Sequence, residues 1–521
     1  MIDFSQWACA VSTATNRSLA GATIALKGGD SASRSAARSA LQQWGMIEVE
    51  ENPDFVCDLE VGVERHSGKP TVSHDFLMTS TQSDFNLRQA DGAHSITHAR
   101  RQMPVTRALV SDLANSGVLK GLSLGVCLVL EPKTAVFLEE LARAGARVGI
   151  YSDAESSDPR VIEELRAQGI LVGIGDSGNG GQRREVALEM LDALSPDLII
   201  DDGASFARLA LMERPELASK LIGVAEETTS GVRAFDAMER EGDLVFPVVA
   251  VNDSVLKTGF DNAHGTGETC VTTLQDLLGA DVFAGKSVAV VGYGPVGRGF
   301  ARRIRALGAS VTVCDIDPVA CLRAIFDGFP TADSAEIFPR ADMVISATGV
   351  RHTVTLSDLQ LLKSGAVVGV IGGIANEIAL DDLPDFTYDP TAAVRNIAVS
   401  GGDHITLVSD GDGVNYTSGN GNPIDIMDLS FAVQTEALRY LLNNRGKLPA
   451  AVHRLGHDSD AHIACVAVRQ RGFGVRSPED DSSYDWRLTR FEDEAAHRHG
   501  TARNASEKPE NQTPTDSEER A

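Results

Sequence analysis

Residues 287–315 limit what this chain can fold into more than any other stretch. An apolar run, Ser287–Val291, leads directly into GYGPVG at 292–297, and helical spacing follows over 300–307. A second apolar run, 310–314, ends at Asp315, 23 residues beyond the first glycine. Strand, glycine-rich turn, helix, strand and acid in this order are the fingerprint of a dinucleotide-binding βαβ unit. The stretch therefore predicts a Rossmann domain with a parallel sheet.

Each position of the turn has a physical reason. Gly292 permits the tight turn, Gly294 lets the backbone approach a pyrophosphate, and Gly297 lets helix and strand pack closely. The pyrophosphate would lie at the positive end of the helix, beside Val296. Asp315 would accept hydrogen bonds from the adenosine ribose and would repel a 2′-phosphate. These residues predict NAD, rather than NADP, as the cofactor; glycines that only turn a loop are the alternative.

The same alternation of apolar strands and helices begins upstream, near residue 96. Expected strands are 124–130, 146–151 and 198–200, and expected helices are 134–144 and 159–168. Alternation of this kind is typical of a mostly parallel sheet covered on both faces. We predict an α/β fold with two doubly wound parallel-sheet domains. The substrate domain spans 96–266, with a returning segment at 423–450, and the NAD domain spans 267–422.

The two ends of the chain differ from this pattern. Residues 1–95 read as an N-terminal α/β extension, with strands at 22–26 and 55–61 and a helix at 31–44. No chemistry is visible there, so docking, oligomerisation and a structural role stay open. After a C-terminal segment at 451–475, residues 476–521 are rich in Glu, Asp, Ser and Pro and poor in aliphatics. Such a composition cannot offset its ordering entropy, which predicts a disordered acidic tail.

Composition excludes several classes of protein. The formal net charge of -26 disfavours nucleic acid as a partner, because phosphate binding needs a basic face. No window approaches 18 uninterrupted apolar residues, so we predict no membrane association. The N-terminus lacks the basic and apolar regions of a secretory signal. Seven scattered cysteines without CxxC spacing predict reduced thiols in a cytoplasmic protein and no metal site.

Further motifs carry a more specific resemblance. They are DDG at 201–203, EETTSGV at 226–232, NDSVLKTGFDN at 252–262, DIDP at 315–318, SATG at 346–349 and VN at 414–415. In this order they resemble the signatures of the S-adenosylhomocysteine hydrolase family. The resemblance covers residues 97–435, roughly the two predicted domains together.

The resemblance implies a redox-assisted elimination. In that family, NAD oxidises the ribose 3′ hydroxyl to a ketone, which acidifies the 4′ C–H. Homocysteine then leaves from C5′, water adds, and the ketone is reduced again. The implied products are adenosine and homocysteine. Their formation is a step of one-carbon metabolism.

Residue roles follow from motif positions in the resemblance. Lys257 is implied as the base for the hydroxyl proton, made useful near neutrality by burial and local charge. Asp261 would orient Lys257 or the hydroxyl, Glu227 would hold the 2′ or 3′ hydroxyl, and Asp202 is placed for the 4′ proton. Without the signature, Lys257 and Asp261 at i, i+4 would read as a solvated helix pair. The implied NAD contacts are Thr228, Thr229, Ser230, Asn262, Thr348, Gly349 and Asn415.

One strand and turn, CLVLEPKTA at 127–135, departs from the family pattern. Val129 stands in the place of a catalytic histidine and cannot move a proton. Glu131 and Lys133 replace the threonine and glutamate that contact adenine. Lys133 turns an acceptor for the adenine amino group into a donor, which would leave adenine unpaired.

Three further substitutions lie near the reacting ribose and the leaving group. Thr266 replaces a cysteine, Gly373 replaces a histidine, and Asn422 replaces the histidine that gates the pocket and contacts adenine. The family's C-terminal lysine and tyrosine, which reach a neighbouring subunit's NAD site, have no match after Lys447. We still predict a homo-oligomer, of undefined subunit number.

Three functions remain open. The first is a divergent NAD-dependent enzyme that oxidises a secondary hydroxyl of a nucleoside or sugar-like substrate, with altered adenine and 5′-leaving-group recognition. The second is ordinary S-adenosylhomocysteine hydrolysis, and the third is a regulatory paralogue that binds NAD without turnover. Retention of the ribose-side residues favours the first. His264 could supply a displaced acid or base, although a lone loop histidine such as His264 or His404 is more often solvated or structural.

Overall fold

The computed structural model describes residues 4–59, 63–66, 69–72, 87, 89–176, 180–373, 376–389, 391–400 and 403–476. Met1–Phe473 form one compact unit. The predicted disordered tail, 476–521, lies outside the described residues except for Arg476. Among the helices described, none is both long and apolar enough to cross a membrane.

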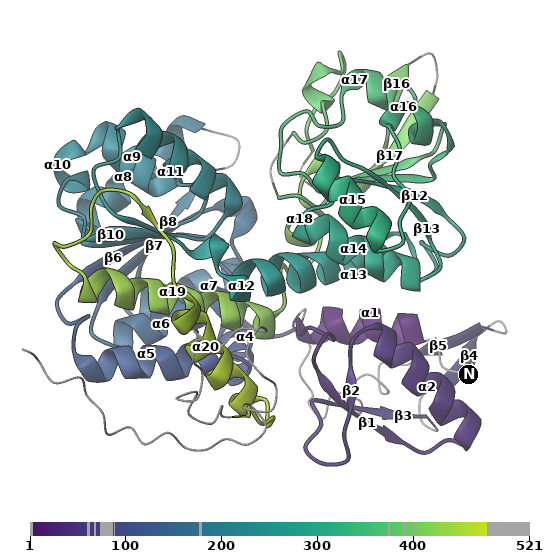
Figure 1. Cartoon of the computed structure of the whole chain (residues 1–521), viewed down its shortest axis with the longest axis horizontal. Helices are drawn as coiled ribbons and strands as arrows, with labels where there is room; N and C mark the ends of the chain where they lie inside the picture. The colour runs from purple at the N-terminus through teal and green to yellow at the C-terminus, as the bar shows by residue number, and fades with distance from the viewer. Residues whose placement is uncertain are drawn as a thin grey trace, which may run out of the picture. The chain divides into compact units, whose positions relative to one another are not determined.

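The N-terminal extension is a small α/β module (Figure 1). Its three-stranded parallel sheet has the order β2-β1-β3, and a separate antiparallel pair, β4-β5, follows. The elements are α1 (Phe4–Thr15), β1 (Thr23–Lys27), α2 (Ser31–Gln43), β2 (Ile47–Glu48), β3 (Phe55–Asp58), β4 (Val63–His66) and β5 (Lys69–Val72). Asp30 starts α2 by accepting a hydrogen bond from the Ser33 backbone N–H at 2.8 Å. The two predicted strands and the predicted helix are present, although β3 ends at Asp58 and so is shorter than the predicted 55–61.

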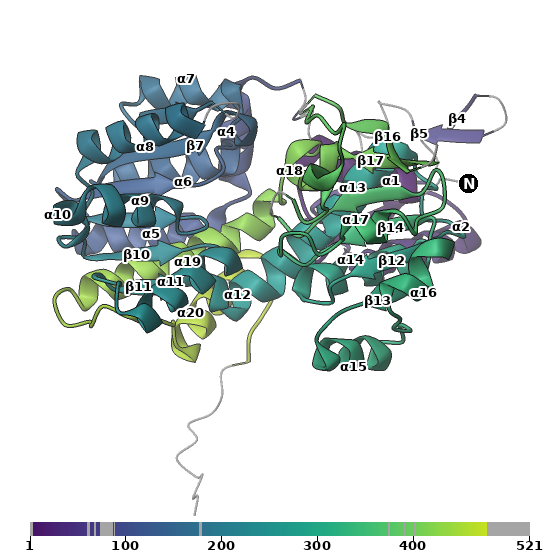
Figure 2. The same ribbon diagram turned by 90° about the horizontal axis from the view of Figure 1, so that it is seen from above.

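The second sheet has seven parallel strands in the order β18-β11-β10-β9-β6-β7-β8. They are β6 (Ser123–Cys127), β7 (Arg147–Asp153), β8 (Leu171–Gly175), β9 (Leu198–Asp201), β10 (Gly223–Glu226), β11 (Val248–Ala250) and β18 (Val452–His453). Helices cover both faces: α4 (Gly92–Arg101), α5 (Pro104–Ser116), α6 (Pro132–Arg143), α7 (Pro159–Ala167), α8 (Gly180–Leu194), α9 (Ser205–Glu213), α10 (Pro215–Ala218) and α11 (Thr229–Glu241). Two late helices, α19 (Ile424–Asn443) and α20 (His457–Gln470), lie against the same domain (Figure 2). Phe431 of α19 stacks on Phe137 of α6 at 4.8 Å between ring centroids.

One predicted strand is shorter than expected. Residues 124–130 were predicted as strand, but β6 ends at Cys127. Leu130 instead forms an isolated bridge with Ser157, and Val129 O accepts a hydrogen bond from Thr134 Oγ1 at 2.8 Å. These contacts turn the chain into α6, so the substituted positions 129–133 lie at the carboxyl end of the strand.

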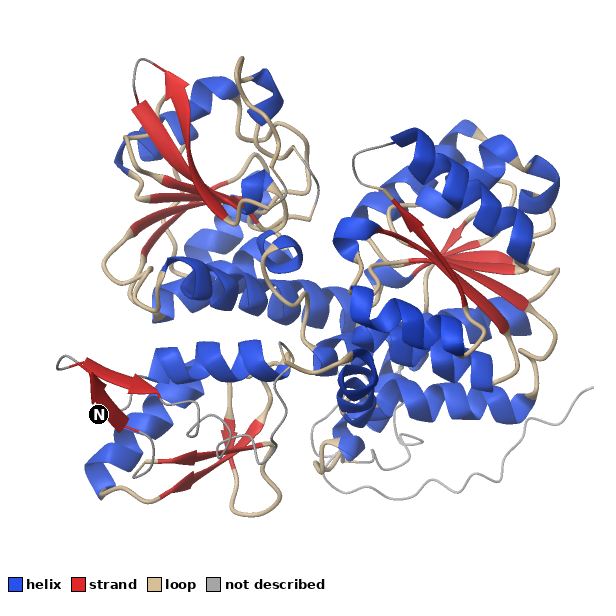
Figure 3. Cartoon of the chain, turned by 180° about the vertical axis from the view of Figure 1, so that it is seen from behind, coloured by secondary structure: helices blue, strands red, loops and turns tan. Residues whose placement is uncertain are grey.

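The third sheet has the order β13-β12-β14-β15-β17-β16. Its strands are β12 (Ser287–Val291), β13 (Ser310–Cys314), β14 (Met343–Ser346), β15 (Val367–Val370), β16 (Val394–Ser400) and β17 (Asp403–Val408). The helices around it (Figure 3) are α13 (Gly267–Leu278), α14 (Pro295–Ala306), α15 (Pro318–Phe326), α16 (Ser334–Ile337), α17 (Leu356–Leu359) and α18 (Val414–Thr417). All pairs are parallel except β16-β17, where the edge strand returns antiparallel. The doubly wound α/β class is confirmed, while the exact domain boundaries stay predictions.

A π-helix, η3 (Thr258–Thr266), joins the short helix α12 (Val255–Lys257) to α13. The segment packs closely against α14 because glycines remove side chains at the contact. A Cβ at Gly299 would lie 2.0 Å from Ala263 O, and one at Gly267 would lie 3.0 Å from the carbonyl carbon of Gly299. The backbone that carries Asp261 is therefore held directly against α14, the helix that follows the glycine-rich turn.

This contact predicts a large effect of one methyl group. Gly299→Ala should lower the free energy of unfolding by about 1–3 kcal/mol, because backbone atoms must separate to admit the methyl. Urea denaturation measures the change. The control is Gly180→Ala in α8, where nothing lies within 4 Å of the added methyl. The control should keep or raise stability by up to about 1 kcal/mol, and wild-type stability of Gly299→Ala would contradict the prediction.

Candidate active site

The glycine-rich turn between β12 and α14 leaves room for a pyrophosphate. Gly292 has φ +93°, and Gly297 faces its carbonyl so closely that a Cβ would lie 2.0 Å from Gly292 O. Gly294 caps α14 in an extended conformation and has no atom within 4 Å of a Cβ position. At the start of α14, Pro295 lacks an N–H group, so the backbone N–H of Val296 is among the first helix donors available to a pyrophosphate.

Asp315 closes the adenosine side of the turn. Its carboxylate accepts hydrogen bonds from the backbone N–H groups of Tyr293 at 2.6 Å and Asp317 at 2.9 Å. Each carboxylate oxygen has a further lone pair for a ribose hydroxyl. The turn and the acid therefore fit NAD.

The turn after β14 also belongs to the cofactor edge, and it is held in place by a residue that the sequence analysis missed. Glu377 is fully buried, and its Oε2 accepts hydrogen bonds from Ser346 Oγ at 2.6 Å, Thr348 N at 3.0 Å and Thr348 Oγ1 at 3.1 Å. These bonds fix the turn after β14 that carries Thr348 and Gly349. Glu377 Oε1 has no hydrogen-bond partner among the described atoms, and a Cβ at Gly372 would lie 2.0 Å from it. An acid shortly after two consecutive glycines beyond a buried strand was the available signal.

The ribose-side candidates follow neighbouring strands of the seven-stranded sheet. Asp202 comes directly after β9, Glu227 after β10 and Asn252 after β11. Carboxyl ends of parallel strands meet at one edge, which is where α/β sheets bind ligands. The substituted residues beyond β6 belong to this same edge.

Lys257 lies among acidic side chains at this edge. Its Nζ is 2.8 Å from Asp261 Oδ2, 3.1 Å from Asn262 Oδ1 and 3.9 Å from Glu227 Oε1. Lys257 is 5% exposed and Asp261 is 4% exposed. The pair is buried, so the solvated-pair interpretation is excluded.

The charge state of Lys257 differs from the prediction. Burial alone would lower its pKa, but the carboxylates of Asp261 and Glu227 outweigh burial and raise the pKa above its ordinary value. A base poised near neutrality was expected, and that expectation is wrong for the free chain. Lys257 is an ammonium here, because its neighbours stabilise the charge.

Glu227 is a carboxylate whose protonation can change near neutrality. Its Oε2 accepts a hydrogen bond from Gln434 Nε2 of α19 at 2.5 Å, while its Oε1 has no hydrogen-bond partner among the described atoms. Burial raises the pKa of Glu227 to about 7, against the opposing effect of Lys257. Burial also raises the pKa of Asp202. The sequence analysis did not identify Gln434, which lies 207 residues from Glu227.

Two neighbouring acids serve the backbone rather than the pocket. Asp201 accepts hydrogen bonds from Phe206 N at 3.0 Å and Ala207 N at 2.7 Å, at the start of α9. Glu226 accepts hydrogen bonds from Gly203 N at 3.0 Å and Ala204 N at 2.9 Å. They hold in place the loop that carries Asp202.

The implied cofactor contacts of the EETTSGV motif gather at the start of α11. Thr228 Oγ1 donates to Glu226 Oε1 at 2.7 Å, accepts from Gly231 N at 3.3 Å and lies 3.2 Å from Ser230 Oγ. Thr229 Oγ1 donates to Asn252 Oδ1 at 3.0 Å. Their hydroxyls are thus ordered at a helix N-terminus.

Hydrogen bonds of two substituted residues, Thr266 and Asn422, connect Asp261 to Asn415, one of the implied NAD contacts. Asn422 Nδ2 donates to Asp261 Oδ1 and, at 3.1 Å, to Thr266 Oγ1. Asn422 Oδ1 accepts from Asn415 Nδ2 at 2.8 Å, and Asn415 Nδ2 also donates to Thr269 Oγ1 at 3.1 Å. A buried polar chain therefore runs from Asp261 to Thr269, and Thr269 was missed by the sequence analysis.

Glu131 and Lys133 engage each other. They form an ion pair, and Lys133 Nζ also donates to Asn420 O at 3.3 Å. Burial raises the pKa of Glu131, opposed by the positive charge of Lys133. The two residues were expected as separate contacts for a ligand. In the free chain they are a buried ion pair. The ammonium of Lys133 and the carboxylate of Glu131 therefore already use part of their hydrogen-bonding capacity.

Val129 and Gly373 add no polar side chain to these networks. Val129 is half-buried and contributes its carbonyl to the turn before α6. Gly373 is exposed, has φ +94°, and has no atom within 4 Å of a Cβ position. Both positions thus offer space without a proton carrier.

The two histidines considered as replacements are placed elsewhere. Arg303 Nη2 lies 3.1 Å from His264 Nδ1, and burial, reinforced by the charge of Arg303, lowers the pKa of His264 to about 4. His264 is therefore neutral and accepts a hydrogen bond from an arginine. His404 lies at the amino end of β17, the opposite sheet edge from the cofactor turn.

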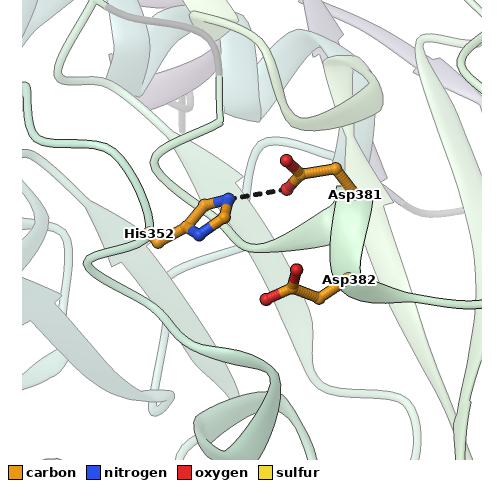
Figure 4. A group of neighbouring side chains, drawn as sticks. All are labelled: His352, Asp381 and Asp382. Carbon is orange, nitrogen blue, oxygen red and sulfur yellow. Dashed lines mark hydrogen bonds and ion pairs between the residues drawn. The ribbon is translucent and has the colours of Figure 1, made fainter.

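A surface group resembles a metal site in composition. His352, Asp381 and Asp382 offer ligand atoms within 4.8 Å of one another (Figure 4). His352 Nε2 lies 2.7 Å from Asp381 Oδ1, and Arg351 Nη2 lies 2.5 Å from Asp381 Oδ2. The ion pair with Arg351 already compensates one of the two carboxylates, so a surface ionic network accounts for the group.

The raised pKa of Glu227 predicts a pH dependence of stability. The folded chain holds this proton more tightly than the unfolded chain, whose glutamate titrates near its ordinary value of 4.5. Glu227 therefore makes the free energy of unfolding fall as pH rises from 4.5 to about 7. In Glu227→Gln the fall between about pH 5 and pH 8 should be smaller by on the order of 3 kcal/mol.

Urea denaturation at several pH values measures this slope. Burial also raises the pKa of Asp201 to about 7. Part of the fall in the free energy of unfolding with pH therefore remains in Glu227→Gln. The control is the exposed Glu216→Gln, which should reproduce the wild-type slope. Equal slopes in wild type and Glu227→Gln would contradict the assignment of a raised pKa to Glu227.

Comparison with known proteins adds to this geometry. Residues 262–421 match the family described as S-adenosyl-L-homocysteine hydrolase, NAD binding domain. The chain is 37% identical over 388 residues to adenosylhomocysteinase of Thermotoga maritima, covering 74% of this chain and 96% of that protein. It is 34% identical over 395 residues to adenosylhomocysteinase of Thermoplasma acidophilum, covering 74% and 95%. It is also 36% identical over 385 residues to S-inosyl-L-homocysteine hydrolase of Methanosarcina mazei, covering 72% and 92%.

Proposed function

The chain belongs to the NAD-dependent S-adenosylhomocysteine hydrolase family, and from that premise we propose that it oxidises a ribose-type 3′ hydroxyl to a transient ketone. The observation that carries the proposal is the buried group of Lys257, Asp261 and Glu227 at the carboxyl edge of the substrate sheet. Bound NAD supplies the two-electron oxidation. The substrate is a nucleoside or a sugar-like molecule with a secondary hydroxyl.

The base in this proposal is a pair of residues. Lys257 carries a proton in the free chain, so it must lose one before it can accept the hydroxyl proton. Glu227 Oε1 lies 3.9 Å away and has no hydrogen-bond partner among the described atoms, so we propose Glu227 as the acceptor. Lys257 passes its proton to Glu227 and then takes the proton of the hydroxyl. Asp261 keeps the ammonium form of Lys257 in place through the 2.8 Å ion pair.

The ketone makes the neighbouring C–H acidic, and Asp202 is the proposed acceptor of that proton. Burial raises the pKa of Asp202, which makes its carboxylate a stronger base than an exposed aspartate. The later family step, loss of a group from C5′, has no histidine at positions 129, 373 and 422. We propose that the ketone leads either to elimination of a leaving group that needs no histidine or to epimerisation, in which no group is released.

The proposal predicts the loss of oxidation in Lys257→Met. Candidate nucleosides mixed with the NAD-loaded wild type should produce NADH absorbance or a 3′-keto product. Lys257→Met should lower that rate at least about 100-fold, because the variant lacks the amine that takes the hydroxyl proton in this proposal. NAD affinity by calorimetry should stay within about threefold, since Lys257 contacts the substrate side.

Lys220→Met, at an exposed position of the same domain, serves as the control and should keep wild-type rates. Robust release of homocysteine from S-adenosylhomocysteine, detected with a thiol reagent, would instead favour ordinary hydrolysis. NAD binding without NADH or a keto product from any nucleoside would favour a regulatory paralogue.

A second candidate concerns the base of the nucleoside. Two relatives act, by name, on S-inosyl-L-homocysteine: that of Methanosarcina mazei and that of Methanopyrus kandleri, 35% identical over 389 residues. Lys133 places a donor where the family accepts from the adenine amino group. A 6-oxopurine carries a carbonyl there and an N1–H beside it, which suit Lys133 and Glu131 as donor and acceptor. We propose a 6-oxopurine nucleoside as the substrate class to test first.

This candidate predicts a preference that a single substitution removes. The rate of NADH formation at low substrate should be at least about tenfold higher with inosine-type than with adenosine-type nucleosides, one hydrogen bond being worth that much. Lys133→Met should reduce the ratio towards one, while Lys220→Met keeps it. A preference of the wild type for adenosine would contradict the 6-oxopurine assignment.

A further inference from the structure

The N-terminal module shares an apolar core with the cofactor domain. Trp7 and Val11 of α1 belong to the same buried cluster as Val271 and Leu274 of α13. Cys9 Sγ donates to the backbone oxygen of α13 residue Thr272 at 3.3 Å. The module is therefore packed onto the helix that continues η3, the segment carrying Asp261.

One polar connection runs from the module through Glu268 to η3. Glu268 is fully buried, and its carboxylate accepts hydrogen bonds from Leu19 N at 2.7 Å and Ser18 Oγ at 3.2 Å. On its other side, Arg303 Nη2 lies 3.4 Å from Glu268 Oε2. Arg303 Nη1 donates to Ala263 O at 3.0 Å. The backbone of η3 is thus tied to the loop that follows α1.

A second connection holds the segment that carries Asn422. Asn420 Nδ2 donates to Thr13 O at 2.8 Å, and Ile424 N donates to Asn16 O at 2.8 Å. Both bonds reach backbone carbonyls at the end of α1. Their donors, Asn420 and Ile424, lie two residues before and two residues after Asn422. The segment is thereby anchored on both sides of Asn422, the residue that hydrogen-bonds to Asp261.

We propose that the N-terminal module is a positioning element that sets the hydrogen bond between Asn422 and Asp261. The two connections hold the two partners of this bond separately: Glu268 and Arg303 act on η3, and the end of α1 acts on 420–424. The bond needs such support because the partners are 161 residues apart in sequence. A buried carboxylate also tolerates little displacement of its partners.

Hydrogen exchange can test the proposal without turnover, so its outcome does not depend on the proposed reaction. Asn420→Ala removes the bond to Thr13 O, and Glu268→Gln weakens the bonds to Leu19 and Ser18. In each variant, amides of both 258–266 and 418–424 should exchange at least about tenfold faster than in the wild type. Stability against urea shows that the variants remain folded, and Asn420→Ala, at a half-buried position, covers the case in which Glu268→Gln does not fold.

Matched controls are available on other surfaces. Glu48→Gln removes an exposed ion pair with Arg38 inside the module, and Asn396→Ala removes an exposed contact with Thr406 in the third sheet. Both should leave exchange in 258–266 and 418–424 unchanged. Unchanged exchange in folded Asn420→Ala, acceleration confined to 418–424, or equal acceleration in the controls would overturn the proposal.

Discussion

The rest of the site depends on how the buried carboxylate of Asp261 is paired and hydrogen-bonded. A buried charge is costly unless it is paired and hydrogen-bonded. Asp261 meets this requirement with Lys257, from α12 beside it, and Asn422, from a segment far along the chain. Satisfying one buried acid therefore brings together the substrate domain, the π-helix and the segment that leads into α19.

The sequence allowed those parts of the fold that depend on local pattern to be predicted. β12 and β13 lie at the predicted residues, because an apolar run bounded by glycine and acid has a nearly unique local solution. β6 was overestimated, since Leu128 and Leu130 are buried by tertiary contacts rather than by strand pairing. Lys257 was found through a motif that also contains its contacts Asp261 and Asn262.

Residues that act across the fold could not be found in this way. Glu377, Gln434 and Thr269 reach their partners over 29 to 207 residues, and apart from the two glycines that precede Glu377 nothing local distinguishes them from ordinary buried polar side chains. Charge states were missed for the same reason. The pKa of Lys257 depends on which carboxylates surround it: they raise it, whereas burial and local charge were expected to bring it near neutrality. The pairing of Glu131 with Lys133 likewise appears only when the turn after β6 is built.

The chemistry of the substituted positions narrows the function further. Asn422 keeps the hydrogen-bonding ability of the histidine that it replaces but cannot exchange protons near neutrality, whereas histidine does both. The network through Asn422 and Asn415 therefore fixes geometry between the redox group and the cofactor side without carrying protons. In the proposed reaction, proton transfer falls to Lys257 together with the carboxylates whose pKa burial has raised, Glu227 and Asp202. Such a division suits oxidation of a hydroxyl and removal of an adjacent proton, the two steps that we propose for the ribose side.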